Sequence, residues 1–160
     1  MYSAEQAYLH ARDVLQKRWL EAEPVIMQDV EYAYRYAKDV IKGRWLEAEP
    51  LILSDAYWSS CYAAQVIKGR WIEAEPMFVN SPELAYYYAR YAVQGRWYEA
   101  EPAIMQDAGA SYWYARDVIK GRWLEAEPIV QSNNDIAQEY LKMVIKRRCL
   151  KFESQIKQSA

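Results

Sequence analysis

One nine-residue phrase returns along this chain at a fixed interval of 26 residues. Its reference copy covers residues 42–50 and reads KGRWLEAEP. No insertion interrupts the interval, and the arginine of the phrase falls at Arg18, Arg44, Arg70, Arg96, Arg122 and Arg148. A tandem array builds its core between neighbouring repeats and not around one centre. The sequence therefore predicts a protein whose repeats stack in the order of the chain.

The first half of each repeat predicts an amphipathic helix. In the second repeat, Asp29 is a favoured N-cap residue, and Glu31 lies in the first turn, where the helix dipole favours an acid. Residues 33–41 then carry apolar side chains at intervals of three and four, the spacing of one helix face. Capping residues occupy the same place in the other repeats: Ser3, Asp55, Ser81, Asp107 and Asn133.

The phrase itself predicts the end of that helix and the start of a shorter one. We expect Gly43 to be the left-handed residue just past the first helix. Its equivalents are Gly69, Gly95 and Gly121. A second helix is expected over about residues 46–53. Because Pro50 cannot donate a helix hydrogen bond, we expect it in the first turn or at a kink.

These features predict an all-α protein, an α-solenoid of six 26-residue helical hairpins with about twelve helices. We expect a single domain over residues 1–160, with repeats ending near residues 28, 54, 80, 106, 132 and 160. In the last repeat the tryptophan becomes Cys149 and the paired alanine becomes Phe152. We interpret this change as a bulk-conserving exchange at one packing site.

Net charge and residue composition limit the partners and the cellular compartment that we expect for this chain. The net charge of -2 gives the chain no overall attraction for nucleic acid or an acidic membrane. The N-terminal stretch carries His10, Arg12 and Asp13 within its apolar pattern, so it predicts neither a signal peptide nor a membrane span. The two cysteines, Cys61 and Cys149, lie more than three repeats apart and indicate no disulfide framework. We therefore expect a cytoplasmic protein with no membrane partner.

Side chains that recur in every repeat predict packing between repeats. A ring kept at the same slot is typical of a repeat core and not of a row of ligand-stacking rings. The tyrosine slot holds Tyr36, Tyr62, Tyr88, Tyr114 and Tyr140, with His10 in the first copy, and the tryptophan slot holds Trp19, Trp45, Trp71, Trp97 and Trp123. Arg44 and Glu49 also recur in all six copies, and we expect them to form ion pairs and helix-end contacts that link hairpins.

The repeated unit supports a family resemblance. Residues 114–128, which read YARDVIKGRWLEAEP, resemble short tandem helical-hairpin repeats of tailed-phage and other viral proteins, over nearly the whole chain. The Gly-Arg-Trp-x-Glu-Ala-Glu turn is also similar, more distantly, to tetratricopeptide and Sel1-like repeats, whose period is longer. The resemblance implies a helical scaffold without a catalytic motif. For a viral protein it also implies the host cytoplasm and a host or antiviral-defence protein as partner.

Positions that change between repeats are the candidates for binding. One flank of the first helix becomes large and aromatic in the middle repeats, where simple repetition does not require it. Tyrosine and tryptophan dominate binding hot spots. The predicted partner-binding residues are Tyr57, Trp58, Tyr87, Tyr91 and Trp113. The alternative is lateral packing of one first helix on the next, which would use Trp58 and Leu84 in particular.

The other flank pairs a tyrosine with a cation four residues later, within reach of a cation–π contact. The pairs are Tyr8 with Arg12, Tyr34 with Lys38, Tyr86 with Arg90, and Tyr112 with Arg116. Such a row suits a nucleotide or single-stranded nucleic acid. The alternative ligand-binding residues are therefore Tyr86, Arg90, Tyr112 and Arg116. Because the third repeat has Ser60 and Ala64 at these slots, a solvated, self-paired face is the preferred interpretation.

No set of residues predicts catalysis. The single histidine, His10, cannot form a histidine-based metal site or triad, and the isolated glycines form no phosphate-binding loop. We expect no metal, no cofactor and no enzymatic activity. The predicted function is a scaffold that binds another protein through the first-helix flank of the middle repeats. The alternatives are the nucleotide or single-stranded nucleic-acid binder and a purely structural assembly protein, with the oligomeric state left open.

Overall fold

The structure, a computed structural model, describes residues 2–146 of the chain. All regular elements in this range are helical, and it contains no strand. The chain divides into two compact units, an N-terminal unit, Met1–Met77, and a C-terminal unit, Phe78–Ala160. Each unit is built from helical hairpins with the period of the repeat.

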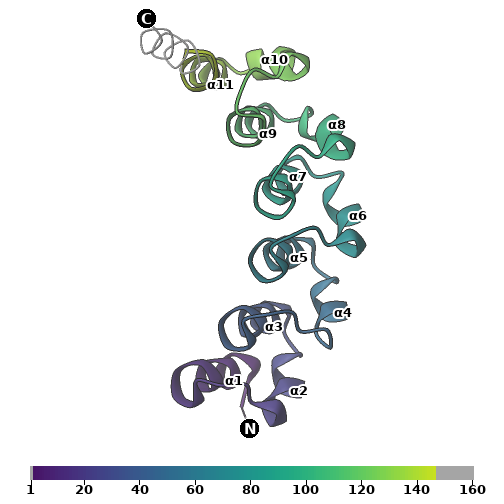
Figure 1. Ribbon diagram of the computed structural model, residues 1–160, viewed down its shortest axis with the longest axis vertical. Helices are drawn as coiled ribbons and strands as arrows, with labels where there is room; N and C mark the ends of the chain where they lie inside the picture. Colours follow the sequence, from purple (N-terminus) through teal and green to yellow (C-terminus); the bar gives the residue numbers. More distant parts are fainter. Residues whose placement is uncertain (1, 147–160) are drawn as a thin grey trace, which may run out of the picture. The chain divides into compact units, whose positions relative to one another are not determined.

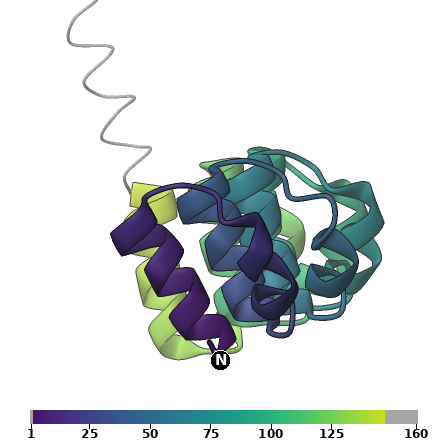
Figure 2. The same ribbon diagram turned by 90° about the horizontal axis from the view of Figure 1, so that it is seen from below.

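In the N-terminal unit three first helices lie side by side, with the shorter second helices along one side of them (Figure 1). Each first helix is an α-helix that widens into a π-helical turn at its end. The first helices are α1 (Ala4–Leu9) with η1 (His10–Leu15), α3 (Val30–Tyr36) with η3 (Ala37–Ile41), and α5 (Ala56–Tyr62) with η4 (Ala63–Ile67). The second helices are η2 (Leu20–Ala22) with α2 (Glu23–Ile26), α4 (Glu49–Ile52), and η5 (Ile72–Ala74) with α6 (Glu75–Phe78). Phe78, the last residue of α6, is counted with the C-terminal unit. Figure 2 shows α1 and η1 as one continuous helix beside α2.

The C-terminal unit repeats this arrangement. Its first helices again lie side by side in the order of the chain. They are α7 (Pro82–Tyr88) with η6 (Ala89–Val93), α9 (Ala108–Tyr114) with η8 (Ala115–Ile119), and α11 (Asn134–Tyr140) with η10 (Leu141–Lys146). The second helices are η7 (Tyr98–Ala100) with α8 (Glu101–Ile104), and η9 (Leu124–Ala126) with α10 (Glu127–Gln131).

The predicted fold class, an all-α solenoid of helical hairpins, is confirmed. The second helix of the sixth hairpin and the exchange at Cys149 and Phe152 fall outside the described residues and stay predictions. No helix within residues 2–146 is both long enough and apolar enough to cross a membrane.

A polar side chain begins every first helix, as predicted. The Asp29 carboxylate accepts hydrogen bonds from the backbone N–H groups of Glu31 and Tyr32, and Ser3 forms a capping box with Gln6. These bonds satisfy N–H groups that have no partner inside the helix. The predicted N-cap residues Ser3, Asp29, Asp55, Ser81, Asp107 and Asn133 are all confirmed.

The prediction that glycine is the left-handed residue at the helix end is wrong. The positive φ falls one residue earlier, at Lys42, with φ of 58°. Its equivalents are Gln16, Lys68, Gln94 and Lys120. The backbone N–H groups of Lys42 and Gly43 both donate to the carbonyl oxygen of Ala37, and this wide closing turn brings the reversal forward by one residue. A Cβ at Gly43 would meet no atom within 4 Å, which explains how Lys17 fills the same place in the first repeat.

The expected second helix is split, and the proline is the reason. Residues 46–48 form a turn, and α4 begins only at Glu49. Pro50 thus lies in the first α-helical turn, where its missing N–H would have no helix partner. The prediction that the proline lies in the first turn is confirmed here and at Pro24, Pro102 and Pro128.

Rings from the tryptophan and tyrosine slots pack against each other inside a hairpin. The centroid of the buried Trp45 ring lies 5.1 Å from that of Tyr36, and the Tyr62 and Trp71 centroids are 5.2 Å apart. The prediction that both slots are core is confirmed for the buried residues Tyr36, Tyr62, Tyr88, Tyr114, Tyr140, Trp45, Trp71, Trp97 and Trp123. Trp19, in the first hairpin, is half-buried.

A polar network, here named the repeat lock, surrounds these rings. Arg44 donates two hydrogen bonds of 2.8 Å to the carboxylate oxygens of Glu49. The Tyr62 hydroxyl, from the next hairpin, donates to Glu49 (3.1 Å) and accepts from the backbone N–H of Trp45 (2.7 Å). The buried carboxylate therefore joins its own hairpin to the next, as expected for the repeated Arg–Glu pair. Equivalent locks contain Glu23 with Arg18 and Tyr36, Glu101 with Arg96 and Tyr114, and Glu127 with Arg122 and Tyr140.

Candidate functional site

The two flanks of the first helix, which were predicted as separate surfaces, contact each other in the structure. In the C-terminal unit, Trp113 and Asp117 of one first helix face Tyr86 and Arg90 of the preceding one. First helices lie side by side, so one flank of each helix contacts the opposite flank of its neighbour. We call this line of contact between neighbouring first helices the seam.

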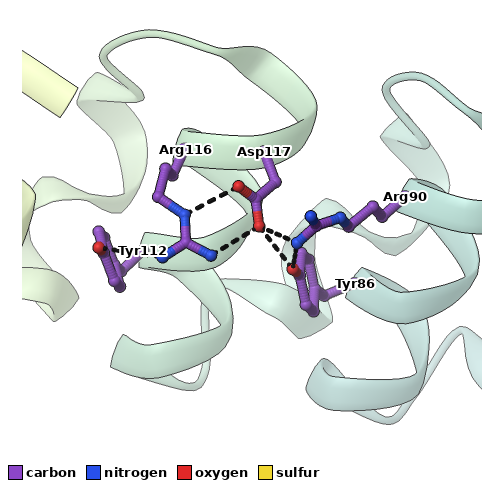
Figure 3. Close-up of polar contacts among 5 residues, drawn as sticks. All are labelled: Tyr86, Arg90, Tyr112, Arg116 and Asp117. Carbon is purple, nitrogen blue, oxygen red and sulfur yellow. Dashed lines mark hydrogen bonds and ion pairs between the residues drawn. The ribbon is translucent and has the colours of Figure 1, made fainter. Parts of the chain in front are cut away.

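A cluster of five polar side chains fills the seam between α7–η6 and α9–η8 (Figure 3). The Tyr86 hydroxyl donates a 2.7 Å hydrogen bond to Oδ2 of Asp117 and accepts one of 2.6 Å from Arg90, which also contacts Asp117 directly. Arg116 donates two bonds of 2.8 Å to Asp117 and one of 3.2 Å to the Tyr112 hydroxyl. One carboxylate thus collects two guanidinium groups and a hydroxyl. We call these five residues the seam cluster.

The charges of the seam cluster fix its protonation state. Burial alone would raise the pKa of Asp117, but hydrogen bonds from Arg116 and Tyr86 and the charges of both arginines outweigh burial and lower the pKa. Burial, reinforced by the hydrogen bond to Asp117, raises the pKa of the Tyr86 hydroxyl. At neutral pH the carboxylate is therefore ionised and the tyrosine is a hydrogen-bond donor.

The first seam of the N-terminal unit has a similar arrangement. Tyr8 donates a 2.7 Å hydrogen bond to Asp39 and accepts one of 2.8 Å from Arg12, which also pairs with Asp13. The predicted cation–π contacts form in three of the four Tyr–cation pairs. These are Arg12 over Tyr8 (5.0 Å), Lys38 over Tyr34 (5.3 Å) and Arg116 over Tyr112 (5.1 Å). In the fourth pair, Arg90 stacks on Tyr91 (4.9 Å) and bonds the hydroxyl of Tyr86.

Three of the predicted partner-binding residues join through the seam cluster into one chain of contacts. The ring centroids of Tyr87 and Tyr91 are 4.8 Å apart, and Arg90 lies over the Tyr91 ring. Arg90 bonds Tyr86, whose ring centroid lies 5.8 Å from that of Trp113. Tyr91 and Trp113 stay 42% and 40% exposed despite these contacts, and Tyr87 is half-buried. We call Tyr87, Tyr91 and Trp113 the aromatic patch.

The other two predicted residues lie in the N-terminal unit. Trp58 is half-buried, with its ring centroid 5.3 Å from that of Tyr34 in the preceding hairpin, which is the lateral packing kept as an alternative. Tyr57 is 59% exposed and meets Trp58 edge-on at 4.9 Å. Tyr57 therefore offers most of its ring to solvent, whereas Trp58 serves the seam.

A set of exposed apolar residues was not predicted as a surface feature. They follow the tryptophan of the phrase: Leu20, Leu46 and Ile72 in the N-terminal unit, and Tyr98 and Leu124 in the C-terminal unit. The sequence signal was their position directly after a core tryptophan, since adjacent residues point in different directions. Each is the first residue of the short 3₁₀ helix or turn that leads into the α-helical part of the second helix.

Within residues 2–146 no group of three or more histidine, cysteine, aspartate and glutamate side chains is placed to hold a metal ion. Comparison of the chain with protein-family models, with curated proteins and with solved structures gave no match.

Proposed function

We propose that this chain is a non-enzymatic scaffold that binds another protein through the aromatic patch of the C-terminal unit. The observation that carries the proposal is that the rings of Tyr91 and Trp113 are exposed to solvent while neighbouring side chains already hold them in place. A ring fixed before binding loses little conformational entropy when a partner covers it. Tyrosine, tryptophan and arginine are also the residue types that dominate binding hot spots.

A pocket beside the patch supports a protein partner. It has a volume of about 360 Å³ and is lined by Arg90, Tyr91, Gln94, Asp117 and Lys120, among others. A partner side chain that enters this pocket would lie against the Tyr91 ring and near polar groups that fix its orientation. Anchors of this kind typically fill pockets at the centre of an interface.

The seam cluster argues against the nucleotide or single-stranded nucleic-acid alternative. Arg90 and Arg116 are both engaged by the Asp117 carboxylate, so a phosphate would have to displace an anion that is already fixed. Tyr112 is almost fully buried and presents little ring surface for base stacking. A protein partner that contacts the exposed rings leaves the cluster intact.

The double variant Tyr87→Ala, Tyr91→Ala is expected to lose ~2 kcal/mol or more of partner affinity, because it removes two hot-spot rings. The partner is first recovered by affinity capture from host lysate with mass spectrometry, since the viral resemblance makes the host proteome the first source to search. Its affinity for wild type and variant is then measured by titration calorimetry, and circular dichroism melting checks that both are folded.

Tyr98→Ala is the matched control, because Tyr98 is also an exposed tyrosine with an arginine, Arg96, 4.8 Å over its ring. It should leave partner affinity unchanged. Equal losses in the double variant and the control would contradict the proposal. If Arg90→Ala with Arg116→Ala abolishes binding instead, and binding falls steeply with salt, the nucleic-acid alternative is favoured.

A further inference from the structure

Pockets recur where the C-terminal ends of neighbouring first helices meet. One lies at the first seam of the N-terminal unit, with a volume of about 340 Å³, and another of about 360 Å³ lies at the seam of Arg90 and Asp117. The pocket at the second seam of the N-terminal unit is the largest of the three, at about 660 Å³. It is lined by Arg12, Lys38, Asp39, Lys42, Gly43, Gln65, Val66 and Lys68.

One substitution within the repeat distinguishes this second seam. At the first seam the later helix supplies Asp39, and at the seam in the C-terminal unit it supplies Asp117, each bonded by a tyrosine of the preceding hairpin. The equivalent residue of the second seam is Gln65, a neutral amide. The later helix of this seam therefore supplies no carboxylate, and Asp39, from the earlier helix, is the carboxylate that lines the pocket.

The cations of the pocket are consequently not all neutralised. Arg12 pairs with Asp13, and Lys38 lies 3.6 Å from Asp39. No carboxylate within residues 2–146 forms an ion pair with Lys42 or Lys68, whose side chains come from successive hairpins and line the same pocket. Four cations, Arg12, Lys38, Lys42 and Lys68, and one carboxylate, Asp39, thus line this pocket, so its lining carries an excess of positive charge.

We propose that this pocket binds a compact phosphorylated small molecule with two or more negative charges, held by Lys42, Lys68 and Lys38. The anion balances the excess positive charge of this lining, as Asp117 balances Arg90 and Arg116 in the C-terminal unit. A volume of about 660 Å³ accommodates a group the size of a diphosphate with part of its carrier. Charge-assisted hydrogen bonds from lysine to phosphate supply the affinity.

The test measures binding of inorganic pyrophosphate to the full chain by titration calorimetry at constant ionic strength. Wild type should bind pyrophosphate, and Lys42→Ala with Lys68→Ala should weaken binding by about tenfold or more, because two charge-assisted contacts are lost. Gln65→Asp should weaken it as strongly, since the variant restores the carboxylate of the other seams. This second variant removes no cation, so its effect separates ligand binding from a structural role of the lysines.

Lys120→Ala is the matched control, because Lys120 ends a first helix with the same left-handed backbone and equally complements the helix dipole. It should leave pyrophosphate affinity unchanged. The proposal is overturned if wild type does not bind pyrophosphate, or if Gln65→Asp binds it as tightly as wild type does. It is also overturned if only oligonucleotides bind, with an affinity that grows with their length.

Discussion

Replacing Trp45 with alanine is expected to lower the free energy of unfolding by ~3–5 kcal/mol, the range for a large buried aromatic side chain. Trp45 is 1% exposed and packs against Tyr36. Its indole nitrogen has no hydrogen-bond partner among the described residues, so the loss measures packing and not a broken side-chain hydrogen bond. Urea unfolding followed by circular dichroism measures the change.

The adjacent residue provides the control. Leu46 is 65% exposed, and Leu46→Ala is expected to change stability by no more than about 0.5 kcal/mol, as is usual for surface substitutions. The two substitutions lie next to each other in the same turn, so they test the assignment of faces and not the importance of the segment. Similar losses at Trp45 and Leu46 would show that the faces are assigned wrongly.

Stability should also fall steeply above about pH 10, the pKa of tyrosine in an unfolded chain. Burial raises the pKa of Tyr36, Tyr62, Tyr114 and Tyr140 in the repeat locks, so the folded chain keeps their protons longer than the unfolded chain does. Their contribution is therefore present below about pH 10 and is lost as the pH rises toward the folded-state values. Each such tyrosine lowers the free energy of unfolding by up to ~1.4 kcal/mol per pH unit.

Tyr62→Phe separates the two effects of one lock. At pH 8 the variant should be less stable by ~1–3 kcal/mol, because the N–H of Trp45 and the carboxylate of Glu49 lose a buried partner. Above about pH 10 its stability should fall less steeply than that of wild type, since one titrating hydroxyl is gone. Urea unfolding at a series of pH values gives both curves, and curves that stay parallel would contradict the assignment.

The features that the sequence predicted correctly depend on local or strictly repeated signals. The cap at Asp29 and the place of Pro50 follow from the chemistry of one helix end, and the burial of Trp45 and Tyr62 follows from their recurrence at every repeat. The position of the left-handed residue at Lys42 was missed because the closing π-helical turn shifts the helix end by one residue. No residue type in the repeated phrase (residues 42–50) indicates that shift.

The candidate site was predicted less completely, because it is formed by pairs of helices. A helical projection separates Tyr86 and Arg90 from the flank of Asp117, since it treats one helix in isolation. Only the packing of neighbouring first helices brings these residues together across the seam. The sequence did single out Trp58 as a residue that lateral packing would use, and in the structure the seam half-buries Trp58, whereas Tyr91 remains exposed.

The most direct test of a chain built from equivalent repeats is to remove one of them. Deleting residues 44–69 joins Gly43 to Arg70, which restores the phrase and lets the repeat lock re-form with its usual residue types. Circular dichroism of this variant should show the helical content per residue of the full chain and a cooperative melt, because every remaining hairpin still has neighbours of the same kind. Deleting only residues 44–56 breaks the 26-residue interval and should prevent cooperative folding. If the full-repeat deletion unfolds the protein as completely as the half-repeat deletion, the hairpins are not equivalent modules.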